Sequence, residues 1–428
     1  MNIERIDLYH ISQWLVSPFV TSFGPQQQRD CLLVAIHADG LTGWGECVAT
    51  NDPGYSYETV VTAWHILSDF LIPALVGKPL AGPEALGPAL SFVRGHPLAK
   101  AALDQAVWDL VAQREGVSLA ALLARPYAEG ARARVKVGVS IGIQPSIART
   151  VEVIGDYFDQ GYRRIKLKIK PGHDVELARA ARAAFPDLPI MLDANSAFRL
   201  EDAAVFQAMD DLKLLMLEQP LGYEDIYDHS HLRPLIATPL CLDESIHSAD
   251  HARYALALGA CDIINVKPSR VAGWTEARRI HDLCRAAGMP LWVGGMLETG
   301  VGRAAQLALA ALPGFKLPGD ISATDRYYER DITAPFTLNR EDSTITCLLY
   351  TSDAADERSS VDLGGRRIIT KKTADERSSV DIVVSSNTKN KRQINVDEIR
   401  EIALVLSGEQ GQTQTRLEEK VLRGEEKT

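Results

Sequence analysis

Three apolar runs in the middle of the chain each end in a carboxylate. ProIleMetLeu precedes Asp193, LeuLeuMetLeu precedes Glu218 and ProLeuCysLeu precedes Asp243, and successive acids lie 25 residues apart. About 25 residues accommodate one strand, one helix and two loops, which is the repeat of a parallel β/α architecture. The pattern therefore predicts that each acid lies at the C-terminal end of a buried strand.

Strand-like segments recur at nearly even spacing on both sides of these three. The eight expected strands are Val135–Gly142, Arg164–Ile169, Pro189–Ala194, Leu214–Gln219, Pro239–Glu244, Ile263–Pro268, Pro290–Gly295 and Phe315–Asp320. Between several of them the pattern is helical, as in Glu176–Phe185 and in Thr275–Ala287, which Gly288 follows as a stop signal. We therefore predict a (β/α)8 barrel over residues 131–325.

The first 130 residues follow a different pattern, in which strands precede helices. The expected elements are strands at Ile3–His10 and Cys31–His37, a glycine-rich turn in Leu41–Glu46, and helices at roughly Tyr57–Ile72 and Leu98–Gln113. Strands followed by helices indicate an α+β domain. We therefore expect residues 1–130 to form a unit separate from the barrel.

A segment rich in Pro, Gly and Ser, residues 17–25, lies between the first two expected strands. This composition predicts a loop, and Phe19 and Phe23 make the loop apolar. Two interpretations remain open. The segment is either an ordered turn packed on the core or a lid that closes over the barrel mouth and excludes water.

The last 80 residues do not continue the barrel pattern. AlaAspGluArgSerSerValAsp occurs at 355–362 and again at 374–381, and no amphipathic pattern persists before Val396–Leu406. We therefore expect residues 348–395 to be disordered. Two copies are too few for a repeat array, so the whole tail, 348–428, is interpreted as a low-complexity or artefactual extension. The alternative is a short partner-binding helix in its last part.

Composition narrows the class of protein. The 428 residues suffice for two or three domains, and the formal net charge of −10 argues against nucleic acid and anionic membranes as partners. The six cysteines are scattered without a C-x-x-C pair, and no apolar run reaches the length of a signal peptide core or a membrane span. We therefore expect a cytoplasmic protein, and we also expect a homo-oligomer.

The three strand-end acids are candidate metal ligands. Acids at the C-terminal ends of neighbouring strands converge at the mouth of a barrel, where such barrels carry their active sites. Asp193, Glu218 and Asp243 would form a set of hard oxygen ligands that suits Mg²⁺ or Mn²⁺ better than Zn²⁺. A single strand-end Asp more often caps the next helix, so the prediction depends on all three acids being in register.

Lysines are expected on both sides of these acids. Lys166 and Lys168 flank Leu167, so the alternation of a strand puts both ammonium groups on one face. Lys267 ends the sixth expected strand, which lies opposite the second strand across the mouth of a closed barrel. The sequence therefore predicts a lysine pair and a single lysine that face each other across a bound metal and substrate.

A lysine acts as a base only if its pKa falls, because the free side chain has a pKa of about 10.4. A neighbouring ammonium group and a nearby divalent cation both disfavour the charged form. We therefore expect Lys166 to lower the pKa of Lys168 and to donate to a substrate carboxylate. Lewis-acid stabilisation of the enediolate that forms when the α-proton leaves would contribute several kcal/mol.

Other residues near the expected strand ends are candidates for substrate binding or ligand orientation. Asn195 and Glu244 follow two of the acids closely and could orient ligands or water, although helix capping explains Asn195 equally well. Ser140, on the first expected strand, is a candidate substrate contact. Gly294 and Gly295 end the seventh strand and leave space at the mouth. The histidines show no metal-ligand spacing and are interpreted as surface or packing groups.

Five motifs together are similar to those of the enolase superfamily, muconate-lactonizing subgroup. They are Lys166-Leu-Lys168, Asp193-Ala-Asn195, Glu218-Gln-Pro220, Asp243-Glu244-Ser245 and Lys267-Pro-Ser-Arg270. Four further stretches, 22–24, 43–46, 294–303 and 317–320, resemble the o-succinylbenzoate synthase / N-acylamino acid racemase family. The resemblance extends over about residues 3–346.

This resemblance implies a fold and a set of roles. The α+β domain would cap the barrel, and residues 326–347 would return to the cap. Mg²⁺ would bind the three acids, Lys168 and Lys267 would be the acid–base pair, and a small-molecule carboxylate would be the substrate. A Lys or His base with Mg²⁺ is characteristic of enolase-superfamily sites.

The chain also departs from related patterns. The seventh strand carries no His, unlike mandelate-racemase-type members. The eighth reads Asp320-Ile-Ser322, not the Asp-x-Asp with which dipeptide epimerases hold the substrate amine, and a helix N-cap is the plain interpretation of Asp320. The usual C-terminal stretch of the family is absent after Thr344–Leu348.

The expected reaction is metal-dependent α-proton abstraction. Within the family, dehydration by an o-succinylbenzoate synthase of menaquinone biosynthesis is the first expectation, and racemisation of N-acylamino acids is the alternative. Two further alternatives come from other classes. One is a Schiff-base aldolase that uses Lys267, and the other is a non-catalytic barrel whose acids only cap helices.

Overall fold

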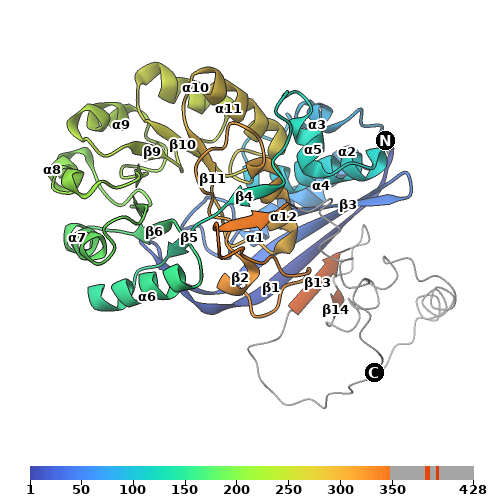
Figure 1. Cartoon of the computed structure of the whole chain (residues 1–428). Helices are drawn as coiled ribbons and strands as arrows, with labels where there is room; N and C mark the ends of the chain where they lie inside the picture. The colour runs from blue at the N-terminus through green and yellow to red at the C-terminus, as the bar shows by residue number, and fades with distance from the viewer. Residues whose placement is uncertain (348–380, 386–391, 395–428) are drawn as a thin grey trace, which may run out of the picture.

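The computed structural model describes residues 1–347, 381–385 and 392–394. Figure 1 shows a parallel strand–helix unit, with helices α6 to α11 around its outside, beside an antiparallel sheet formed by the N-terminal strands. Within the described part, no helix is long and apolar enough to cross a membrane.

A seven-stranded parallel sheet forms the barrel wall, and its strands follow one another in sequence order. The strands are β5 (Val139–Ile141), β6 (Ile165–Lys168), β7 (Ile190–Asp193), β8 (Leu217–Glu218), β9 (Leu240–Leu242), β10 (Ile263–Val266) and β11 (Leu291–Val293). Each lies inside one of the segments expected from sequence. The α/β barrel-type fold is therefore confirmed.

The eighth expected strand, Phe315–Asp320, is not a regular strand. It forms single parallel bridges to Leu291 and to Val137, and the Asp320 amide donates to Val293 O at 2.9 Å. Pro318 has no amide hydrogen, which prevents a continuous ladder. The segment nevertheless joins β11 to the chain before β5 and so connects the two edges of the sheet.

The first expected strand is also divided. Arg134–Lys136 (β4) pairs antiparallel with β12 (Thr344–Thr346), whereas β5 pairs parallel with β6. The break falls at Gly138, where a Cβ atom would lie 2.4 Å from the guanidinium of Arg164. The chain pairs with β12 before this glycine and with β6 after it, so the single expected strand is divided into two short strands.

Helices follow most barrel strands and cover them. They are α6 (Ile147–Asp159), α7 (Val175–Ala184), α8 (Ala203–Gln207), α9 (Tyr227–Leu232), α10 (Ala249–Leu258), α11 (Trp274–Ala286) and α12 (Gly300–Ala310). The helices predicted at 176–185 and 275–287 correspond to α7 and α11. Gly288 has a φ of +70° just after α11, which is the helix stop expected of a glycine. Apolar side chains of strands and helices form one large buried cluster.

The N-terminal unit contributes three strands of a five-stranded antiparallel sheet and packs helices on one face. Its elements are β1 (Ile3–Thr21), β2 (Gly24–Ala38), β3 (Leu41–Cys47), α1 (Val60–Ile66), the π-helical η1 (Leu67–Leu71), α2 (Ile72–Leu75), α3 (Pro83–Ala89), α4 (Pro97–Glu115) and α5 (Leu119–Ala124). At Gly45 a Cβ atom would lie 1.9 Å from Ala102 O. Glycines on β3 therefore let α4 pack directly on the sheet.

The loop predicted at residues 17–25 is instead the end of a β-hairpin. β1 and β2 remain paired up to Thr21 and Gly24, with an irregularity between Trp14 and Phe19. Pro25 has no amide hydrogen, but it lies in β2 next to the end of the ladder, where it pairs with Val20. The prediction of a loop was therefore wrong, and the lid function of this tip stays a prediction.

Two short strands lie within the segment that was expected to be disordered. β13 (Asp381–Ser385) pairs antiparallel with β1, and β14 (Arg392–Ile394) pairs with β13. β1 would otherwise offer an open edge, and the IleValVal sequence of β13 has high β-propensity. The expectation of disorder for 348–395 stays a prediction, because 348–380, 386–391 and 395–428 lie outside the described residues.

Asp104 links the N-terminal unit to the barrel. From α4, its carboxylate accepts hydrogen bonds from Trp274 N at 2.6 Å, Thr275 N at 3.1 Å and Thr275 Oγ1 at 2.6 Å. The N-cap of α11 is Gly273, and a Cβ there would lie 2.4 Å from Asp104 Oδ2. A residue of one unit thus caps a helix of the other.

Replacing Asp104 by Ala should lower the free energy of unfolding by about 2 kcal/mol, because α11 loses its N-terminal acceptor. Urea unfolding followed by circular dichroism would measure this change. The control is Asp69→Ala, the same substitution at an exposed position of η1, which should leave the midpoint unchanged. Equal midpoints for Asp104→Ala and the unmodified chain would contradict the assignment.

Candidate active site

The three candidate acids meet at one end of the barrel. Asp193 and Glu218 are the last residues of β7 and β8, which pair with each other, and Asp243 directly follows β9. All three are completely buried, at 0% exposure. Parallel strands present their C-terminal ends at one mouth, so the topology brings together acids that are distant in sequence.

Lys166 lies between two of these acids. Its Nζ is 3.1 Å from Asp193 Oδ2 and 3.0 Å from Glu218 Oε2. A third carboxylate, Asp320 Oδ2, lies closer still, at 2.6 Å. Lys166 is only 2% exposed, and its ammonium group is therefore enclosed by three carboxylates.

Lys168 projects from the same strand toward the same site. Its Nζ is 2.6 Å from both Asp193 Oδ2 and Asn195 Oδ1, while Leu167 packs in the apolar core. Asn195 Nδ2 donates to Glu244 Oε1 at 2.9 Å. Asn195 has a φ of +44° and lies between β7 and the next helical turn without capping it. The structure therefore places Asn195 and Glu244 as partners that orient Lys168.

Lys267 approaches the acids from the other side, directly after β10. Its Nζ is 2.8 Å from Asp243 Oδ2 and 3.0 Å from the hydroxyl of Tyr55, which belongs to the N-terminal unit. Arg270 contacts the other oxygen, Asp243 Oδ1, and also donates to Tyr55 at 3.2 Å. Both oxygens of Asp243 are thus held by cationic side chains.

These contacts determine the protonation of the acids. Burial favours the neutral form of Asp193, but Lys168 and Lys166 outweigh it and hold its pKa below the usual range. Burial and the charge of Asp193 raise the pKa of Glu218 well above its usual value. Burial disfavours the charged form of Lys267, but Asp243 outweighs it and raises its pKa. The pKa values of the two neighbouring acids, Asp193 and Glu218, are therefore shifted in opposite directions.

The three acids have the oxygen atoms that a metal ion needs, although in this structure they form ion pairs with lysine ammonium groups. In the described part of the chain, no three side chains of His, Cys, Asp or Glu form a group that could hold a metal as they stand. Lys166 bridges Asp193 and Glu218, and Asp243 is engaged by two cations. Nevertheless, a hard divalent cation prefers oxygen donors of this kind, which here are three buried carboxylates on neighbouring strands. All three already pair with cationic side chains.

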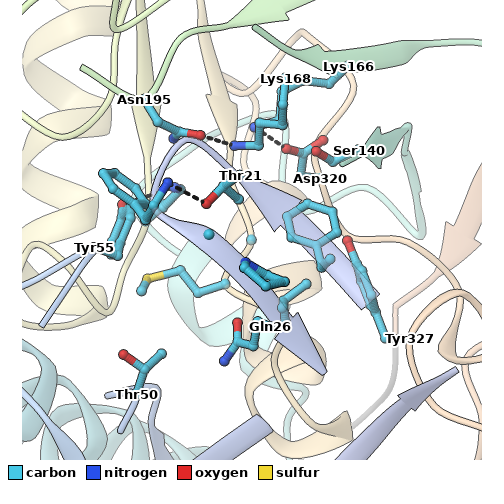
Figure 2. A pocket seen from close by; sticks show the side chains of 18 of the residues that line it. Thr21, Gln26, Thr50, Tyr55, Ser140, Lys166, Lys168, Asn195, Asp320 and Tyr327 are labelled. Atoms are coloured by element: carbon cyan, nitrogen blue, oxygen red, sulfur yellow. Dashed lines mark hydrogen bonds and ion pairs between the residues drawn. The ribbon is translucent and has the colours of Figure 1, made fainter. Parts of the chain in front are cut away.

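A cavity of about 200 Å³ opens beside these groups. Figure 2 shows Lys168 directed at Asn195 at one end of the view, with Gln26 and Thr50 at the other end. The candidate residues that line the cavity are Phe19, Phe23, Ser140, Lys166, Lys168, Asn195, Lys267 and Gly295. The acids, Glu244 and Gly294 lie outside this lining. The cavity therefore exposes the lysines, with the carboxylates behind them.

The hairpin tip contributes one wall of the cavity. The Ser22 hydroxyl donates to Asn195 O at 3.4 Å, and the Ile143 amide donates to Val20 O at 2.8 Å. On β5, the buried Ser140 Oγ has no hydrogen-bond partner among the described residues. The tip thus contacts the barrel mouth, and Ser140 has a hydroxyl free for a ligand.

Gly294 and Gly295 are required at the end of β11 for space. A Cβ on Gly294 would lie 2.4 Å from Asn265 Oδ1 and 2.8 Å from Lys267 Cε. A Cβ on Gly295 would lie 2.5 Å from Asp320 O. These are backbone and site atoms, so a larger residue at either position must displace the site.

Gly294→Ala should lower kcat/KM about 100-fold, because it pushes Lys267 out of position and an error of about 1 Å has such an effect. Steady-state assays would measure the loss. Gly155→Ala is the control, since its Cβ in α6 would meet only Phe185 at 3.8 Å and should leave kcat/KM unchanged. Near-normal turnover of Gly294→Ala would show that Lys267 does not need its present position.

Sequence reasoning missed several residues of the site. Asp320 was interpreted as a helix N-cap, which is wrong, because it pairs with Lys166 and Arg164 and the next helical turn has Ala323 as its N-cap. Tyr55 belongs to the N-terminal unit, so no local pattern indicated it. The signal for Asp320 was its position at the end of the eighth expected strand, Phe315–Asp320.

Two family models match the chain. The first is the mandelate racemase / muconate lactonizing enzyme N-terminal domain, over residues 5–124, and the second is the enolase C-terminal domain-like family, over residues 149–347. These ranges correspond to the N-terminal unit and to most of the barrel with the segment that follows it.

Curated relatives match over most of their length. An o-succinylbenzoate synthase of Geobacillus stearothermophilus is 52% identical over 336 residues, which are 78% of this chain and 88% of the relative. An N-succinylamino acid racemase of Thermus thermophilus is 47% identical over 332 residues, 78% of this chain and 89% of the relative.

A solved structure agrees with these matches. An enolase-superfamily protein of Enterococcus faecalis superposes with a TM-score of 0.76 at 40% identity, covering 82% of this chain and 94% of that one. Both domains, the close relatives and the barrel geometry lead to one assignment. The chain belongs to the mandelate racemase / muconate lactonizing enzyme family of the enolase superfamily.

Proposed function

We propose that this enzyme removes the proton α to a carboxylate and that its main reaction is the dehydration that forms o-succinylbenzoate. The observation that carries the proposal is the placement of Lys168 and Lys267, which line one cavity while each pairs with a different member of the acid group. The 52% identity to an o-succinylbenzoate synthase supports the choice of reaction.

The proposed reaction is an elimination of water. Lys168, in its unprotonated form, takes the α-proton from the substrate, and the electron pair of the C–H bond moves toward the carboxylate. The bond to the hydroxyl group then breaks, and the leaving hydroxide takes a proton from the Lys168 ammonium and departs as water. Lys267 remains charged on the opposite face and stabilises the intermediate. The ring of the product becomes aromatic.

The acids have a separate role in this proposal. Asp193, Glu218 and Asp243 would hold Mg²⁺ or Mn²⁺. When bound, the cation would supply Lewis-acid stabilisation of the developing enediolate, worth several kcal/mol. Ser140 and the hairpin tip with Phe19 and Phe23 would contact the rest of the substrate and exclude water.

Racemisation of N-succinylamino acids is a second candidate, and a specific observation favours it. Two lysines that reach one cavity from β6 and from the end of β10 could remove a proton on one face and return it on the other. The 47% identity to an N-succinylamino acid racemase supports this candidate. A Schiff-base aldolase is disfavoured, because the two relatives described above are a synthase and a racemase and the Lys267 ammonium group is paired with Asp243 and hydrogen-bonded to Tyr55.

An assay of the purified full chain with both substrate classes would test the proposal. The hydroxylated cyclohexadiene acid whose dehydration gives o-succinylbenzoate, and an N-succinylamino acid, would each be supplied with and without Mg²⁺. The proposal predicts a higher kcat/KM for dehydration than for racemisation. A larger value for racemisation would reverse the order of the two candidates, and no turnover of either would reject both.

A further inference from the structure

Asp320 is the closest anionic partner of Lys166 but does not belong to the three acids assigned to the metal. Its Oδ2 lies 2.6 Å from Lys166 Nζ, compared with 3.0 Å for Glu218 and 3.1 Å for Asp193. Figure 2 shows Lys166 and Asp320 on the same side of the cavity. The Lys166 ammonium group therefore contacts two of the acids assigned to the metal, Asp193 and Glu218, and one carboxylate outside that set, Asp320.

Asp320 is held rigidly by a second cation. Its Oδ1 accepts from Arg164 Nη1 at 2.6 Å, and Arg164 Nη2 donates to Pro318 O at 3.0 Å. Gly138 leaves the space that the guanidinium occupies. The indole of Trp292 lies beneath both cations, 5.0 Å from Lys166 Nζ and 5.6 Å from the Arg164 guanidinium carbon. These buried contacts keep one oxygen of Asp320 directed at Lys166.

The present contacts of Lys166 conflict with metal binding. An ammonium group that bridges Asp193 and Glu218 competes with a divalent cation for the same carboxylate oxygens, and the two positive charges repel each other. Lys166 is buried and remains charged, so it needs another anionic partner when it leaves these acids. Asp320 lies at hydrogen-bond distance and already makes the shortest of the three contacts.

We propose that Asp320 is a positioning residue that withdraws Lys166 from Asp193 and Glu218 when a divalent cation binds. The inference depends on the metal site of the proposed function and adds a residue to it. Asp320 acts through Lys166 alone: it leaves the carboxylates open to the cation and keeps the lysine beside the cavity.

Mg²⁺ titration of the full chain by isothermal calorimetry would test this role. Asp320→Asn should weaken Mg²⁺ binding about tenfold or more, the usual effect of losing a partner outside the ligand set. In a Lys166→Met background the same substitution should change the affinity less than about twofold, because the group that Asp320 acts on is absent. Asp325→Asn, at an exposed position nearby, should have no effect.

The outcomes separate this inference from the metal site itself. If the unmodified chain binds no Mg²⁺, the proposed site fails. If it binds Mg²⁺ and Asp320→Asn binds it equally well, or if Asp320→Asn weakens binding equally in both backgrounds, only the role of Asp320 fails.

Should Asp320→Asn not fold, because Arg164 loses its partner, Lys166→Met alone decides. That variant should bind Mg²⁺ more tightly, and unchanged or weaker binding would overturn the inference.

Discussion

Lys168→Ala should stop the exchange of the α-proton with solvent deuterium for one enantiomer of an N-succinylamino acid and leave the other enantiomer exchanging. Lys267→Ala should give the reverse pattern. Lys168 pairs with Asp193 and Lys267 pairs with Asp243, so each lysine reaches the cavity from its own side. Loss of a positioned base typically lowers the rate about 100- to 10,000-fold.

Proton NMR of each enantiomer in D₂O would measure both exchange rates. Lys170→Ala is the control, because Lys170 is an exposed lysine shortly after β6 and should leave both rates unchanged. If each variant lost exchange of both enantiomers equally, the assignment of one base to each face would be wrong, although enolate chemistry would remain.

Glu218→Gln should abolish activity while the metal-free chain still folds. Burial and the neighbouring Asp193 raise the pKa of Glu218 well above its usual value, and Gln has nearly the shape of the side chain that it replaces. The bond from Asn265 Nδ2 to Glu218 Oε1, at 2.7 Å, can persist with the amide oxygen, whereas the contact of Lys166 Nζ with Oε2, at 3.0 Å, is lost. A bound cation would lose one anionic ligand, and kcat/KM should fall at least about 1,000-fold.

Two measurements would separate these effects. The melting temperature in EDTA should fall slightly, because the contact with Lys166 is lost, while the stabilisation by added Mg²⁺ should disappear. Glu152→Gln, at an exposed position on α6, should change neither quantity. Mg²⁺-dependent turnover within about tenfold of normal in Glu218→Gln would remove this acid from the ligand set.

The barrel and its acids could be predicted because their signal is local and repeated. Apolar runs that end at Asp193, Glu218 and Asp243 recur at a fixed interval, and the topology of parallel strands converts this interval into proximity. The pair Lys166 and Lys168 followed in the same way from strand alternation. Each of these residues lies inside a predicted strand, and all but Lys166 lie next to its last residue.

The remaining features depend on contacts that no local pattern encodes. Tyr55 reaches the site from the N-terminal unit, and Asp320 finds Lys166 only when the barrel closes. The hairpin tip at 17–25 reads as a loop by composition, yet pairing with β2 keeps it extended. β13 (Asp381–Ser385) follows a polar stretch and pairs with β1, a contact distant in sequence.

The central claim is that a divalent cation and the lysines together remove an α-proton. Deuterium uptake at the α-carbon of an N-succinylamino acid, followed by NMR with the purified full chain, tests it most directly. The account predicts uptake with Mg²⁺, its loss in EDTA and its return when Mg²⁺ is restored. Uptake that continues at the same rate in EDTA would contradict it, and so would the absence of both uptake and dehydration in the presence of Mg²⁺.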